Sequence, residues 1–171
     1  MKKLLASAAI LACFCSPLAV ADEDRDADDR SQHATTIAVF SEKQDSWWPR
    51  SHHIGAREKF TAILEPRAGG RWYERGDDGS ECNWGRVLVW EPPHRMVLAW
   101  EINADWQHDP SIANEVQVKF IAEGRERTRV ELEHRRIERY GDKADAMLKA
   151  FDSPDGWAGI LRAMARAAEE A

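Results

Sequence analysis

Apolar and polar residues alternate along the middle of the chain, between residues 58 and 135. A period of two residues predicts β-strands. Turn sequences divide this region into short segments: Ala68-Gly69-Gly70, Asp77-Asp78-Gly79, Pro92-Pro93 and the EGRER stretch at 123–127. We therefore expect about six consecutive antiparallel strands, with one apolar face and one charged face.

Helical spacing flanks this region on both sides. Ile37, Phe40, Gln44 and the pair Trp47-Trp48 recur every three or four residues, and Pro49 ends that pattern. A shorter helix is expected over roughly 141–151.

A longer helix is expected at the C-terminus, with Ser153 as N-cap and Pro154 at its first position. Its apolar stripe consists of Trp157, Leu161, Met164, Ala165 and Ala168. Such a stripe needs an apolar surface to cover, and the open face of the sheet offers one. The pattern predicts an α+β fold with a curved sheet packed on a long C-terminal helix.

The N-terminus has a different character. A basic start, an apolar run and the Ala19-Val20-Ala21 motif are typical of a signal peptide over residues 1–21. A lipoprotein signal before Cys13 and a misassigned start are the alternatives. Residues 22–34 are mostly acidic or small and are expected to form a flexible linker, followed by one domain over 35–171. If the signal is genuine, the chain would be exported to the periplasm or outside the cell. If it is not, the chain would be cytoplasmic.

Composition narrows the range of functions. The 171 residues carry a net charge of −6, which argues against nucleic-acid binding. The apolar N-terminal run is too short for a stable membrane span. Removal of a signal peptide would leave Cys82 alone, so the mature chain could form no internal disulfide. Eight tryptophans are many for one domain and favour an aromatic core, pocket or interface.

Several stretches together resemble one family. They are WWPRSHHIG, ILEPRAGGRWYERGDDGSECNWGRVLVWEPPHRMVLAWEINADW, VKFIAEGRERTRVELEHRRIERYG and FDSPDGWAGILRAMA. They look like the SRPBCC (START-like) superfamily, and more narrowly the bacterial family related to the C-terminal domain of the activator of the heat-shock protein ninety ATPase. The resemblance covers about residues 35–170 and implies a helix-grip fold. It also implies a cavity between sheet and helix that often holds an apolar small molecule.

The resemblance supplies no catalytic residues. Co-chaperone activity belongs to eukaryotic relatives with an additional domain. Family members usually open with a strand before the first helix, and they are mostly cytosolic. Here the acidic DEDRDADDR stands at that place, so the strand is either lost or supplied by the apolar segment before it.

Metal and catalytic sites have weak support in the sequence. His52 and His53 are adjacent and point apart on a loop, so with His134, Cys82 and Glu101 they could form a zinc site only by tertiary accident. We expect no metal and no cofactor. Asp105, His108 and Asp109 share a loop and could form an acid/base pair, but only within hydrogen-bond reach. We expect no catalytic residues, with an enzyme of the cyclase or hydrolase type as an alternative by fold analogy.

Binding of a hydrophobic small molecule is the function we expect. The candidate cavity residues are Trp47, Trp48, His52, His53, Trp72, Trp84, Trp90, Trp100, Phe120, His134, Trp157 and Leu161. His134 alternates with Val130 and Leu132, so its imidazole should point inward and need a partner. A filled core would explain the same residues. The rival function is a protein-interaction or co-chaperone-like module, and an open sheet edge would permit a homodimer.

Overall fold

The computed structural model describes residues 4–6, 34–124 and 127–170. Residues 34–41 are helical. The further elements are α2 (Gln44–Trp47), β1 (Leu4–Ala6), β2 (Phe60–Leu64), β3 (Arg71–Gly76), β4 (Glu81–Glu91), β5 (Arg95–Trp100), β6 (Asn114–Ala122), β7 (Thr128–Arg135), the 3₁₀ helix η1 (Ile137–Lys143), α3 (Ala144–Phe151) and α4 (Trp157–Glu169).

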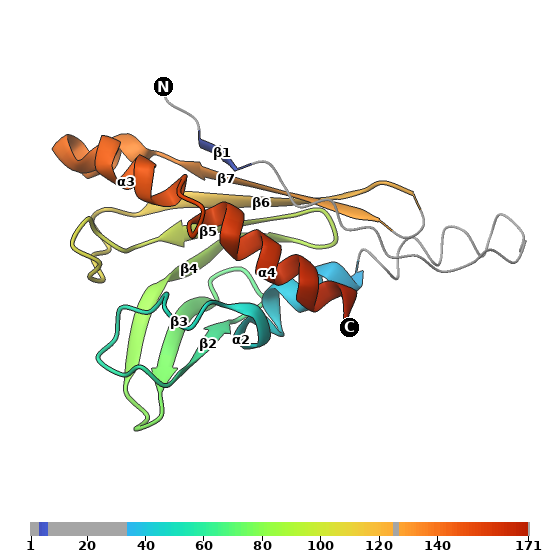
Figure 1. The fold of residues 1–171 in the computed structure, drawn as a ribbon, viewed down its shortest axis with the longest axis horizontal. Coiled ribbons are helices and arrows are strands. Elements are labelled where there is room, and N and C mark those ends of the chain that lie inside the picture. Colours follow the sequence, from blue (N-terminus) through green and yellow to red (C-terminus); the bar gives the residue numbers. More distant parts are fainter. Residues whose placement is uncertain (1–3, 7–33, 125–126, 171) are drawn as a thin grey trace, which may run out of the picture.

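The strands form one antiparallel sheet in the order β1-β7-β6-β5-β4-β3-β2. From β2 to β7 each strand pairs with the next in sequence, because the short turns let each strand return beside its predecessor. The helix α4 crosses one face of this sheet (Figure 1). The α+β helix-grip architecture expected from the sequence is confirmed.

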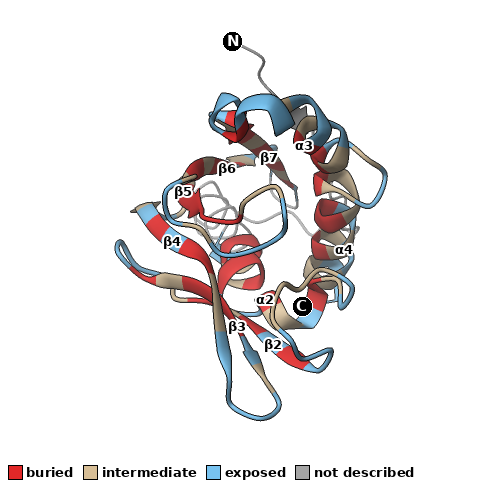
Figure 2. Cartoon of the chain, turned by 90° about the vertical axis from the view of Figure 1, so that its left-hand side faces the viewer, coloured by how far each residue is buried: buried red, intermediate tan, exposed pale blue. Residues whose placement is uncertain are grey.

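The core lies between the sheet and the helices, where the buried parts of the strands and of α4 face each other (Figure 2). The alternation predicted for β7 holds, because Val130, Leu132 and His134 are at most 3% exposed. In α4, Trp157, Leu161 and Met164 are buried as the helical period requires. The apolar pattern therefore correctly indicates which face of each element is covered.

The first helical region is divided, contrary to the prediction of one continuous helix. A turn at Glu42 and Lys43 separates residues 34–41 from α2. The hydroxyl of Ser41 donates to the carbonyl of Ile37 at 2.7 Å, a local bond that often bends helices. Both Glu42 and Lys43 then donate their N–H to the carbonyl of Ala38, so the regular hydrogen-bond ladder ends there.

The predicted start of the last helix is also wrong. Ser153 and Pro154 lie in a turn, and α4 begins at Trp157 with Gly156 as its N-cap residue. The Ser153 hydroxyl donates to the carbonyl of Ala150, so it closes the end of α3 instead of capping α4. A Cβ at position 156 would lie 2.2 Å from the carbonyl oxygen of Phe151, so this tight turn requires glycine.

The N-terminal strand β1 pairs with β7 through the register Leu4 with His134 and Ala6 with Leu132. The strand of the apolar segment thus covers the sheet edge that would otherwise be open at β7. Residues 7–33 lie outside the described part of the chain, so most of the predicted signal peptide and the acidic linker do too. Among the described residues, no helix has the length and apolar character needed to cross a membrane.

Candidate functional site

A cavity of about 510 Å³ opens between the sheet, the segment that follows α2, and the α3–α4 turn. Its volume falls within the range of small-molecule sites. Aromatic side chains line much of it: Trp48, Trp84, Trp100, Trp106, Phe151 and Trp157. The other lining residues are Ile54, Ile102, Ala150, Gly156 and Ile160, with the polar residues Ser51, His52, His53, Ser153 and Asp155.

The aromatic rings support one another by direct contact. The rings of Trp48 and Trp84 lie 5.0 Å apart, centre to centre, and are tilted by 32°. Trp100 meets the rings of Phe151 at 5.8 Å and Trp157 at 5.4 Å, both nearly edge to face. These distances and angles are favourable for aromatic pairs. The wall is therefore apolar and held in place by packing across β4, β5, α3 and α4.

Six of the candidate residues from the sequence line this cavity: Trp48, His52, His53, Trp84, Trp100 and Trp157. The other six do not: Trp47, Trp72, Trp90, Phe120, His134 and Leu161. The indole of Trp47 donates to the carbonyl of Val39, and that of Trp72 donates to Gln44 Oε1, so both are fixed within the core. That any of these residues contacts a ligand stays a prediction.

The structure also brings in residues that the sequence pattern did not single out. Ile160 follows Trp157 by one helical turn and could have been chosen from that spacing. Phe151 ends α3, where its apolar stripe was not resolved from the sequence. Trp106 lies in a polar loop without periodicity, so the pattern gave no signal for it.

Polar groups gather at the rim of the cavity. His52 Nε2 lies 3.0 Å from the backbone oxygen of Asp155, and His52 Nδ1 lies 3.1 Å from the Ser51 hydroxyl. A carbonyl oxygen can only accept a hydrogen bond, so Nε2 carries the proton in the neutral ring. Nδ1 is then the acceptor for the Ser51 hydroxyl. The contact also joins the segment after α2 to the α3–α4 turn.

His134 stands behind the aromatic wall and is completely buried. Its Nδ1 accepts a hydrogen bond from the Trp157 indole at 3.1 Å, and its ring centre lies 4.3 Å from that of Phe151. Burial lowers the pKa of His134 from 6.5 to about 3. The imidazole is therefore neutral and fixes two aromatic residues of the cavity.

Glu74, on β3, binds the backbone of the segment that follows α2. Its Oε1 accepts the backbone N–H groups of Ile54 and Gly55, and the side chain is 2% exposed. Burial raises the pKa of this carboxyl, against the effect of the two N–H groups, of nearby His53 and of the Trp84 indole. Glu74 therefore fixes the cavity rim at Ile54 to the inner face of β3.

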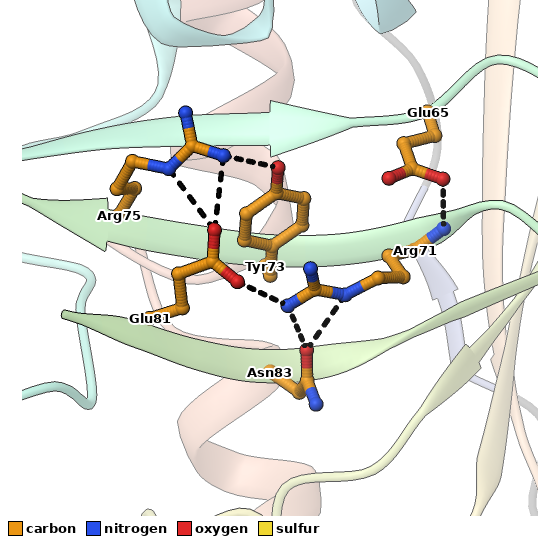
Figure 3. Close-up of polar contacts among 6 residues, drawn as sticks. All are labelled: Glu65, Arg71, Tyr73, Arg75, Glu81 and Asn83. Atoms are coloured by element: carbon orange, nitrogen blue, oxygen red, sulfur yellow. Dashed lines mark hydrogen bonds and ion pairs between the residues drawn. The ribbon is translucent and has the colours of Figure 1, made fainter. Parts of the chain in front are cut away.

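A polar network covers the other face of β3 and β4 (Figure 3). The guanidinium of Arg71 lies 3.9 Å above the ring centre of Tyr73, and Glu81 accepts hydrogen bonds from both Arg71 and Arg75. Asn83 also accepts from Arg71. Because β3 and β4 present Trp72 and Trp84 on the inner face, this network joins the two strands that carry them.

The loop residues considered for acid/base chemistry have different hydrogen-bond partners. Asp109 accepts hydrogen bonds from the hydroxyl and N–H of Ser111, which lower its pKa. His108 Nε2 faces Glu101 at 3.2 Å, and Asp105 is exposed. Within the described ranges, no group of three or more His, Cys, Asp or Glu side chains is placed to hold a metal ion.

Comparison with known proteins gives a consistent result. Residues 41–169 match the family model described as Activator of Hsp90 ATPase homolog 1-like protein. The solved structure of an anthrahydroquino-gamma-pyrone synthase, Txn09, is 32% identical, with 97% of this chain and 96% of that chain covered and a TM-score of 0.60. A comparison with curated proteins gave no significant match.

Two further solved structures share the fold. The self-sacrificing resistance protein CalC from Micromonospora echinospora is 28% identical, with 81% of this chain and 87% of that chain covered and a TM-score of 0.57. A protein from Nitrosomonas europaea is 12% identical over 81% of this chain and 87% of its own, with a TM-score of 0.52. The last likeness concerns the fold alone.

Proposed function

The chain belongs to the Activator of Hsp90 ATPase homolog 1-like family, and from this premise we propose that it binds an aromatic small molecule in the cavity between the sheet and α4. The observation that carries the proposal is the cavity of about 510 Å³ with its aromatic wall. Apolar walls with a few polar groups at one end are the usual make-up of ligand sites. The likeness to a pyrone synthase, which is named for an aromatic compound, supports the same class of ligand.

Filling the mouth of the cavity should abolish this binding. Ser153 is half-buried at the mouth, and its replacement in Ser153→Trp would put an indole into the space of the ligand. We expect the affinity for 1,8-dihydroxyanthraquinone, measured by calorimetry, to fall at least about tenfold, or roughly 1.4 kcal/mol. Loss of the Ser153 hydrogen bond to the Ala150 carbonyl should lower the free energy of unfolding by only about 1 kcal/mol, so the variant should stay folded.

The matched control is Ser111→Trp. Ser111 is an exposed loop serine that bonds to Asp109, as Ser153 bonds to a nearby carbonyl, but it lies outside the cavity. Its variant should bind the probe like the parent chain. Equal affinity in the Ser153→Trp variant, the control and the parent would rule out the cavity as the site.

Proton-transfer catalysis is a second candidate, favoured by the contacts of His52. The Asp155 carbonyl fixes the tautomer in which Nδ1 is free of a proton, and the Ser51 hydroxyl adjoins that nitrogen. Such an imidazole can act as a general base through Ser51: Nδ1 takes the hydroxyl proton while the hydroxyl oxygen takes a proton from an acidic O–H or C–H group of a bound aromatic compound. The base would take the proton and return one to the same atom, so the reaction needs no further reagent.

Anthrone in D₂O tests this candidate, because its C10 protons are acidic and their exchange is visible by proton NMR. If His52 is the base, the rate acceleration of proton exchange by His52→Gln should be about a hundredfold smaller than that by the parent protein. His108→Gln, which changes an imidazole outside the cavity, should leave the rate unchanged. No acceleration by the parent, or the same acceleration by His52→Gln, would leave binding as the function.

A further inference from the structure

Trp106 is an exposed aromatic residue at the mouth of the cavity. Its side chain is 47% exposed. Among the described residues, Leu88 is the other large hydrophobic side chain that is exposed to a similar extent. Trp106 lines the cavity, and its ring meets that of Phe151 edge to face at 6.3 Å. One side of the indole is thus turned to the aromatic wall while much of its surface remains in water.

The backbone at Trp106 is in the left-handed region, with φ at 58°. For a bulky residue this conformation costs about 1–3 kcal/mol, whereas glycine and asparagine adopt it more readily. The loop holds it through Asn103, whose Oδ1 accepts the N–H groups of Asp105 and Gln107 at 3.0 Å each. The backbone of Asn103 also pairs with Trp106 and Gln107. The strained backbone at Trp106 therefore holds the indole in a fixed position that leaves 47% of it exposed to water.

Polar groups complete the mouth of the cavity. Ser51, His52 and Asp155 supply polar atoms there, while Phe151 and Trp157 lie within. A ligand with a flat ring system could lie against the indole and place a polar substituent near His52. A globular ligand of the same apolar area would meet the indole only at its edge, and would gain less from stacking.

We infer that Trp106 is the specificity-determining residue of the cavity, which selects planar aromatic ligands by covering their exposed ring face. The inference rests on the proposed function, because it assigns a role in binding at that same cavity. The inference adds that the ligand is planar and that the hydrogen bonds of Asn103 hold the indole over its ring face. The strain at Trp106 is then offset when the ligand buries the ring.

Trp106→Asn removes the aromatic ring but keeps the backbone conformation, because asparagine tolerates the left-handed region. The variant therefore measures the contribution of the ring alone. We expect its affinity for planar 1,8-dihydroxyanthraquinone to fall about tenfold, and its affinity for globular 1-adamantanol to change less than about threefold. Trp106→Phe keeps a ring and should stay within about threefold of the parent for both probes. The melting temperature of Trp106→Asn should equal or exceed that of the parent.

Leu88→Asn is the control, since Leu88 is 40% exposed and lies outside the cavity. It should change neither affinity. If Ser153→Trp abolishes binding while Trp106→Asn leaves the planar probe unaffected, the inference on Trp106 fails and the proposed function stands. If neither variant affects binding, both fail. An equal loss for the planar and globular probes, or a clear loss of stability in Trp106→Asn, would assign Trp106 a structural role and overturn the inference.

Discussion

Lowering the pH from 7 to 5 is expected to reduce the free energy of unfolding by about 2 kcal/mol through His134 alone. Burial lowers the pKa of this imidazole from 6.5 to about 3 in the folded chain. Between these values the unfolded chain takes up a proton and the folded chain does not, so unfolding is favoured as the pH falls. The loss begins near pH 6.5 and levels off near pH 3, and above pH 6.5 the group contributes nothing to the pH dependence.

Urea denaturation of the parent and of His134→Gln at pH 7, 6 and 5 measures this effect. Glutamine can accept the hydrogen bond from Trp157, as Nδ1 of His134 does, but it does not titrate. The carboxyl of Glu74 acts in the opposite direction, because its raised pKa favours the folded chain at low pH. It is present in both chains and cancels in their difference. A stability difference between the two chains that is the same at pH 7 and pH 5 would contradict the prediction.

Periodicity correctly identified the inward faces of the strands but not which inward residues reach the cavity. Trp72 and Trp84 belong to neighbouring inner positions and are each 1% exposed, yet Trp84 lines the cavity and Trp72 donates to Gln44 in the core. The alternation of side chains depends on the local backbone, whereas a cavity depends on how the helices approach the sheet. That approach is set by residues far apart in sequence, such as His52 and Asp155.

Helix ends and loops were also harder to predict than strands. Ser153 has the side chain and the following proline of a helix start, but its hydroxyl bonds backward to Ala150. The choice between these two partners depends on the packing of the turn, which requires Gly156. Trp106 was overlooked for a related reason, since its place at the cavity follows from the hydrogen bonds of Asn103 and not from any repeat.

The strand β1, which covers the edge of β7, could also not be predicted from the sequence. The sequence left open whether the family's first strand was lost or supplied by the apolar N-terminal segment. The pairing of Leu4–Ala6 with β7 corresponds to the second possibility. Composition could not decide, because the apolar run of a signal peptide and a short buried strand are both rich in aliphatic residues.

Gly85→Ala is expected to destabilise the chain by about 3 kcal/mol or more, at the upper end of the cost of overpacking. A Cβ at position 85 would lie 1.8 Å from the carbonyl oxygen of Ala99 on the adjacent strand. Backbone atoms of β5 cannot move away without separating β4 from β5, which are paired at Gly85 and Trp100. The variant should therefore show a much lower urea midpoint than the parent, or no folded state.

Gly69→Ala is the matched control for this variant. Gly69 has a φ of 76° and open space around the added Cβ, so alanine there costs only the left-handed conformation, about 1–2 kcal/mol. Similar urea midpoints for the two variants would show that β4 and β5 can adjust to the added methyl group.

If a folded Gly85→Ala chain is obtained, its affinity for 1,8-dihydroxyanthraquinone should also be lower than that of the parent. Trp84 and Trp100 lie on the two strands that the methyl group forces apart, and both indoles belong to the aromatic wall. Gly69→Ala should keep the affinity of the parent, because the contacts that place those two indoles are unchanged.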